Sequence, residues 1–149
     1  GFFFFFSSRV KMSMRLIDGE FPDYGQVIPK DEGVNAYIPC AALADSLRRV
    51  ALMVTDKGKC VKMDFTRNNL RISSSSPELG EAEERLEIRY EGEPVSIGFN
   101  ARYILDVIGS LGDCDTLIIE LHGKLGPGRI FTESDESYMA VVMPMRLSE

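Results

Sequence analysis

Positions 95–112 read VSIGFNARYILDVIGSLG, a short apolar strand that runs directly into an amphipathic helix. We expect the strand at Val95–Phe99, because Asn100 is a favourable N-cap whose side chain accepts from a free N–H group of the first helical turn. The helix extends to about Leu111, and Gly112 ends it. Its apolar residues recur at the spacing of one helical face: Ile104, Val107, Ile108 and Leu111.

The same order of elements occurs earlier in the chain. A short strand near Val34–Ile38 precedes a predicted helix from Pro39 to Thr55, and proline suits a first helical turn. The apolar stripe of this helix is Cys40, Leu43, Ala44, Leu47, Val50, Ala51 and Val54. Strands are predicted after the two helices at residues 60–65, 70–75 and 82–90, and at 116–122, 129–132 and 138–142.

The order strand, helix, three strands therefore occurs twice between Val34 and Val142. Each half has an apolar helix stripe and a sheet face that need the other half to close a core. We predict an α+β fold of two pseudo-symmetric β-α-β-β-β halves, with the two helices on one face of antiparallel sheet.

The first 33 residues differ from the rest. Phe2–Phe6 and the alternating segment 9–16 predict a hairpin within residues 1–24, and prolines and glycines make 25–33 a linker before a domain at 34–149. A lone hairpin is marginally stable, so we expect it to belong to a larger sheet or to pack on the later part of the chain. Because the chain opens at Gly1, we also expect its natural start to lie upstream.

Composition sets limits on the function. The 149 residues are 44% hydrophobic and carry 17 Lys+Arg against 23 Asp+Glu, which excludes a uniformly basic nucleic-acid coat. Residues 40–72 hold seven basic and three acidic side chains, whereas residues 78–93 hold seven glutamates and two arginines. The first stretch predicts either a locally basic face for phosphate or an ordinary mixed surface.

Catalytic and metal-binding motifs are not evident. His122, the one histidine, ends an apolar strand without a nucleophile beside it, and Gly123–Gly128 lacks the Walker order, so it indicates a turn. Three widely spaced cysteines favour a reducing cytosol over a disulfide framework or zinc site. No apolar run approaches the roughly 20 residues of a membrane span. We predict a cytoplasmic protein that is not an enzyme, with no cofactor, no metal and no membrane association.

Two apolar features suggest partner surfaces. On the first helix, Arg49 falls near the middle of the solvent side, while Leu52 and Met53 miss the buried stripe. Those two could form a partner surface or lie under a neighbouring loop. The adaptable methionines and rigid proline of Met143–Leu147 suit a groove that receives several peptides, or a strand end that caps the core.

Five stretches, in order along the chain, resemble the bacterial DNA polymerase sliding clamp, the beta subunit of the replicative polymerase. They are Leu16–Tyr24, Val27–Pro29, Ile97–Asn100, Tyr103–Val107 and Met143–Leu147. The resemblance implies a DNA-clamp domain from a protomer of three similar domains, and two such protomers close into a ring around duplex DNA. This chain would supply the last hairpin of the middle domain and the whole third domain. Polymerase subunits, the clamp loader and repair proteins would bind through short peptide motifs, giving processivity.

The resemblance also implies roles for particular residues. DNA-facing residues, which would act on double-stranded DNA without sequence preference, are Arg48, Arg49 and Arg102. The homodimer interface would use Leu52, Met53, Glu81, Glu83 and Glu84. The peptide groove would use Pro22, Gln26, Val27, Met143, Pro144, Met145, Arg146 and Leu147. Gln26 stands where many relatives carry a basic residue, and residues 148–149 extend past the usual terminal leucine. Without the neighbouring domains we expect this chain to be monomeric; the alternative is a free-standing peptide-binding module that does not encircle DNA.

Overall fold

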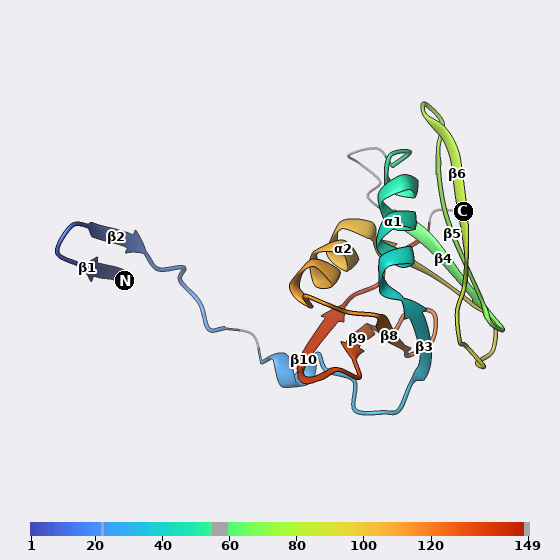
Figure 1. The fold of residues 1–149 in the computed structure, drawn as a ribbon. Helices are drawn as coiled ribbons and strands as arrows, with labels where there is room; N and C mark the ends of the chain where they lie inside the picture. Colours follow the sequence, from blue (N-terminus) through green and yellow to red (C-terminus); the bar gives the residue numbers. More distant parts are fainter. Residues whose placement is uncertain (22, 55–59, 148–149) are drawn as a thin grey trace.

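The computed structural model describes residues 1–21, 23–54 and 60–147, and it contains two helices and ten strands within them (Figure 1). The first strands are β1 (Phe2–Phe6) and β2 (Lys11–Arg15), followed by a short 3₁₀ turn, η1 (Tyr24–Gln26). The first half contains β3 (Val34–Pro39), α1 (Cys40–Ala51), β4 (Cys60–Thr66), β5 (Asn69–Ser76) and β6 (Gly80–Glu87). The second half contains β7 (Val95–Asn100), α2 (Ala101–Ser110), β8 (Thr116–Leu121), β9 (Gly128–Thr132) and β10 (Asp135–Val142).

The two halves form two four-stranded antiparallel sheets by exchanging their first strands. One sheet has the order β6-β5-β4-β7 and the other β10-β9-β8-β3. Thus β7 of the second half pairs with β4, and β3 of the first half pairs with β8. The predicted element order is confirmed, but the strands lie in two interlocked sheets, an exchange that the sequence pattern did not predict.

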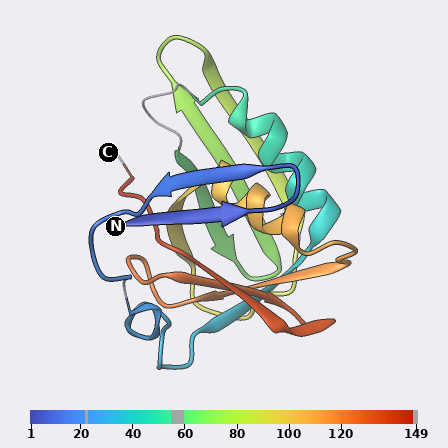
Figure 2. The ribbon, with the colours of Figure 1, turned by 90° about the vertical axis from the view of Figure 1, so that its left-hand side faces the viewer.

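Both helices lie side by side on one side of the sheets (Figures 1 and 2). Helix α1 packs on α2, β3, β5 and β6, whereas α2 packs on α1, β7 and β10. The core between helices and sheets contains side chains that are fully or almost fully buried, among them Leu43, Leu47, Met63, Phe65, Phe99, Ile104 and Ile119. The predicted arrangement of two helices on a common face is therefore present.

Helix α1 and strand β6 end earlier than predicted, each for a local reason, and β6 and β10 begin earlier than predicted, at Gly80 and Asp135. Helix α1 ends at Ala51, because the N–H groups of residues 52–54 bond to carbonyls three residues back and tighten the last turn; the predicted end, Thr55, lies outside the described residues. The strand predicted at residues 82–90 ends at Glu87, whose partner Asn69 is the first residue of β5. Beyond it, Arg89 instead exchanges two backbone hydrogen bonds with Tyr37 of β3.

The hairpin β1–β2 stands apart from the rest of the domain (Figure 1). Its register pairs Phe3 with Met14 and Phe5 with Met12, so all four side chains share one face. All five phenylalanines are exposed, by 47% to 66%. The predicted hairpin is present, with its apolar face uncovered. Among the described residues, neither helix has the length and apolar character to cross a membrane.

Candidate functional site

The linker and β10 enclose an apolar cavity of about 500 Å³. It is lined by Phe21, Tyr24, Val27, Ile28, Ser137, Met139 and Val141. Tyr24 is 70% exposed, Val27 45% and Met139 42%, so the aromatic and aliphatic walls are open to a partner. Large apolar side chains that stay accessible in a concave site are typical of a binding groove.

The turn η1 fixes the linker wall of this cavity. Asp23 caps the turn, since its Oδ1 accepts from the Gly25 N–H at 3.0 Å and its Oδ2 from the Gln26 Nε2 at 3.2 Å. The Gln26 side chain is therefore turned back onto Asp23, while Val27 lines the cavity. Of the predicted groove residues, Pro22 lies outside the described residues.

A second cavity, of about 430 Å³, lies against the same linker. It is lined by residues 26–31 together with His122 and Pro127. His122 is half-buried, and its Nε2 lies 3.7 Å from Oε2 of Glu120. Gln26 and Val27 thus line this second cavity, and no serine, threonine or cysteine lines it together with His122.

The predicted groove residues Met143, Pro144, Met145, Arg146 and Leu147 form a tail that continues from β10. Met145 donates from its backbone N–H to the carbonyl oxygen of Gly98 at 2.8 Å, which places the tail on β7. A Cβ at position 98 would lie 2.7 Å from the Met145 oxygen and 2.9 Å from Cδ2 of Leu147. The close approach therefore requires glycine at this position. Met143 remains 57% exposed.

Sequence reasoning missed most of the cavity. Phe21, Tyr24 and Ile28 lie in stretches that carried the resemblance, but nothing local marked them as walls of a site. Side chains alternate between the two faces of a strand, so Ser137, Met139 and Val141 lie on one face of β10. This alternation was the sequence feature that could have predicted the β10 wall of the cavity. The link between β10 and the linker, more than 100 residues apart, needed the folded chain.

The three predicted DNA-facing arginines have different surroundings. Arg48 pairs with Asp45 at 2.8 Å on α1, and Arg102 lies 3.9 Å from Asp106 on α2. Their side chains are 64% and 80% exposed. Arg49 instead reaches β6, where its Nε and Nη2 donate to the two carboxylate oxygens of Glu84 at 2.7 and 3.0 Å. The helical position of Arg49 predicts a solvent-facing side chain, and in the structure the Glu84 carboxylate largely neutralises its charge.

The predicted interface residues meet at one edge of the molecule. Strand β6 is the terminal strand of its sheet and packs against α1, and Leu52, which caps the end of α1, is 74% exposed. Met53 comes next in the chain and is half-buried. Glu84 faces α1, while Glu81 and Glu83 share the outer face of the strand, where Glu81 accepts from Ser75. Glu83 and Glu84, consecutive residues of β6, thus lie on opposite faces of the strand.

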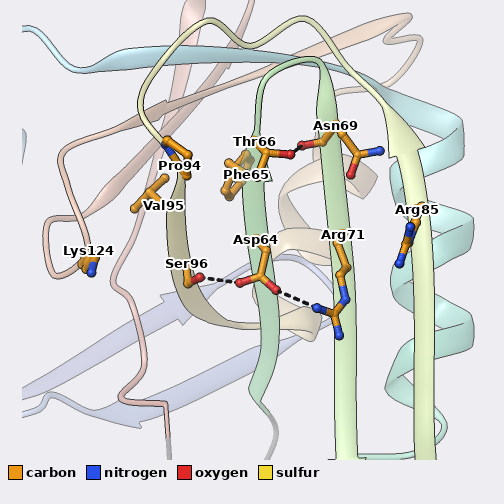
Figure 3. Close-up of a pocket in the computed structure, with 10 residues that line it drawn as sticks. All are labelled: Asp64, Phe65, Thr66, Asn69, Arg71, Arg85, Pro94, Val95, Ser96 and Lys124. Carbon is orange, nitrogen blue, oxygen red and sulfur yellow. Dashed lines mark hydrogen bonds and ion pairs between the residues drawn. The ribbon is translucent and has the colours of Figure 1, made fainter.

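Charged side chains on neighbouring strands form a row across the outer face of the β6-β5-β4-β7 sheet (Figure 3). Asp64 of β4 accepts from Ser96 of β7 and lies 3.8 Å from Arg71 of β5. Glu83 accepts from Arg85 at 2.9 Å and from Arg71 at 2.7 Å, and these bonds, with Arg85 the larger cause, lower the pKa of Glu83. Cations and carboxylates pair with one another along the row, which makes it an ion-pair network on a sheet surface.

Two repeated β-α-β-β-β halves, interlocked sheets and a helix pair on one side define the class: this is a DNA-clamp domain, with an open apolar cavity between the linker and β10. The family model for the DNA polymerase III beta subunit, C-terminal domain, matches residues 25–146. The chain belongs to that family.

Similar proteins and solved structures support the same family assignment. The beta sliding clamp of Vibrio cholerae is 38% identical over 133 residues, which are 89% of this chain and 36% of that protein. The beta sliding clamp of Escherichia coli K12 is 36% identical with the same coverage, so this chain spans little more than a third of the length of these relatives. A sliding clamp from Bartonella birtlesii, solved bound to griselimycin, gives a TM-score of 0.86 at 30% identity over 98% of this chain and 39% of that one. The predicted resemblance and fold class are confirmed.

Proposed function

We propose that this chain is the C-terminal part of a sliding clamp, which encircles duplex DNA and tethers polymerase and repair enzymes through short peptides. The observation that carries the proposal is the open apolar cavity between the linker and β10, in a domain of the clamp family. The chain then acts by binding and carries out no chemistry of its own, in the cytoplasm. Residues 1–24 are the last hairpin of a preceding clamp domain, and residues 25–33 link it to the C-terminal domain at 34–149.

The groove suits apolar peptide side chains. Its walls combine two aromatic residues, Phe21 and Tyr24, with Val27 and the flexible thioether of Met139. Apolar burial provides most of the affinity in such a site, and methionine adapts to ligands of different shape. Leucine or phenylalanine of a bound motif enters this cavity, and Gln26 and the Met143–Leu147 tail contact the rest of the peptide.

Contact with DNA is diffuse in this proposal. The exposed surfaces of α1 and α2 lie side by side and carry Arg48 and Arg102, whose pairs with neighbouring aspartates are solvent-exposed and weak. Such cations attract phosphates without reading bases, so the interaction falls steeply with salt. Arg49 contributes less, because Glu84 already neutralises it.

The β6 edge, with Leu52, Met53, Glu81, Glu83 and Glu84, is the surface that meets a neighbouring protomer. Strand β6 ends its sheet and can accept another strand, while Leu52 offers an exposed apolar contact. The complementary domain of the family is the first domain of a second protomer. This chain alone therefore stays monomeric and forms no ring.

Peptide titration tests the groove. A fluorescein-labelled peptide carrying the Gln- and Leu/Phe-containing clamp motif is titrated against the chain and three variants. We expect Met139→Ala and Val27→Ala each to raise Kd by about tenfold, the loss of roughly 1.4 kcal/mol of apolar contact. Leu125→Ala, which removes an 80% exposed leucine from the β8–β9 turn, is the matched control and leaves Kd unchanged. Equal affinity of all four proteins would refute the groove assignment.

The sequence of the gene upstream of Gly1 distinguishes a sliding clamp from a free-standing peptide-binding module. A reading frame that continues upstream of Gly1 and encodes the first clamp domain and the rest of the middle one supports encirclement of DNA. A start codon directly before Gly1 supports a free-standing peptide-binding module.

A further inference from the structure

Two cysteines from different halves of the domain lie next to each other where β3 passes into α1. The β3–β8 pairing ends with Pro39 opposite Thr116, and the Cys40 N–H donates to the Asp115 carbonyl at 2.9 Å. Cys114 precedes Asp115 in the α2–β8 connection. This hydrogen bond holds the backbone of Cys40 against Asp115, the residue directly after Cys114.

Both thiol side chains also face the same core. Cys40 is 4% exposed, and Cys114 is half-buried and packs on the same hydrophobic cluster. Burial first, and then the neighbouring Cys114, raise the pKa of the Cys40 thiol to about 12. Burial and the second sulfur thus outweigh the helix N-terminus, which on its own lowers a thiol pKa.

We propose that Cys40 and Cys114 are an oxidation site that forms an intramolecular disulfide when the chain meets a hydroperoxide. The more accessible Cys114 attacks the peroxide as its thiolate, which breaks the O–O bond, gives a sulfenic acid and releases one water after proton transfer. The sulfur of Cys40 then displaces hydroxide from the Cys114 sulfur. The new S–S bond forms, and the hydroxide leaves as water with the Cys40 proton. In total two thiols lose two electrons and two protons, and one H₂O₂ becomes two H₂O.

The bond would join the two halves covalently at the start of the helix layer. Cys40 is the first residue of α1, and Cys114 lies in the connection from α2 to β8. A cross-link between such distant positions removes conformational freedom from the unfolded chain and raises its stability. Cys60 is the internal reference: it lies at the start of β4, is half-buried, and burial alone raises the pKa of its thiol.

Mass spectrometry tests the proposal on the full chain. The protein is treated with H₂O₂, alkylated with N-ethylmaleimide and digested without reductant. We expect one cross-linked peptide pair, Cys40–Cys114, alkylated Cys60, and full reversal by dithiothreitol. The midpoint of thermal unfolding of the oxidised protein should rise by about 5 °C or more.

Three single variants separate the outcomes. Cys60→Ser should keep the cross-link and the rise in Tm, and Cys114→Ser should abolish both. Cys40→Ser should abolish both as well; because Cys40 is buried, Cys114→Ser carries the test if Cys40→Ser does not fold. Sulfinic acid at Cys114 beside an alkylated Cys40, or disulfides that involve Cys60 to a comparable extent, would overturn the assignment.

Discussion

The two halves of the domain share one order of elements but distribute burial in opposite ways. Helix α1 buries six residues, whereas α2 buries only Ala101 and Ile104 and leaves its remaining apolar stripe half-buried. For the ion pairs the second half is the more buried one: Glu120 of β8 is 4% exposed, while Glu83 of β6, in the first half, lies in an exposed network. Helix α1 packs on three strands and on α2, which explains its deeper burial. The two halves therefore share an order of elements, while the neighbours of each element set how deeply its side chains are buried.

The largest expected effect contrasts one substitution in the two helices. Leu47→Ala removes a fully buried side chain of α1, and we expect a loss of about 4 kcal/mol in the free energy of unfolding. Leu105→Ala, the matched change in α2, removes a half-buried side chain and should cost about 1 kcal/mol. Urea unfolding followed by circular dichroism measures both. Equal losses would contradict the asymmetry between the halves.

Next in size is the contrast between the two sets of ion pairs. Arg129 lies 2.5 Å from Oε2 of Glu120, whose other oxygen accepts from the Gly33 N–H at 2.8 Å. Arg129→Ala would leave a buried carboxylate with its main countercharge removed, so we expect a loss of about 2–3 kcal/mol. Arg85→Ala, at the 68% exposed end of the surface network, is the control and should cause little change. If both variants unfold at the same urea concentration, Glu120 is not stabilised by Arg129.

The sequence predicts features that depend on local spacing. The stripe from Leu43 to Val50 and the opposite faces of Glu83 and Glu84 follow from helix and strand periodicity, and the structure has both. Strand exchange between the halves, as in the pairing of β7 with β4, depends on which strands become neighbours in the folded domain. Periodicity carries no information about that choice.

The candidate site shows the same limit. Val27 and the tail were found from local composition and the resemblance, but the cavity exists because residues of the linker meet β10 at the opposite end of the chain. Arg49 shows the same limit of sequence-based prediction for a single side chain. Its helical position predicts exposure to solvent, and only the packing of α1 on β6 brings it to Glu84, 35 residues further along.

The smallest expected effect concerns that Arg49–Glu84 pair, and pH isolates it. Hydrogen bonds from Arg49, the larger cause, and from Ser46 lower the pKa of Glu84 below its ordinary value of 4.5. The folded state therefore holds the charged carboxylate more strongly than the unfolded state, and the contribution is fully present above pH 4.5 and is lost as pH falls through the lowered folded value.

Glu84→Gln should accordingly be slightly less stable than the wild type at pH 7, and the difference should shrink as the pH falls below about 4.5. Urea midpoints at pH 7, 5, 4 and 3 measure it, with Glu78→Gln in the exposed β5–β6 turn as the control. Because the Arg49–Glu84 pair is solvent-exposed, added salt should reduce the difference in stability at pH 7. Salt should weaken the Arg129–Glu120 pair less, because the Glu120 carboxylate is buried. A difference independent of pH would mean that Glu84 acts through packing on α1 and not through its charge.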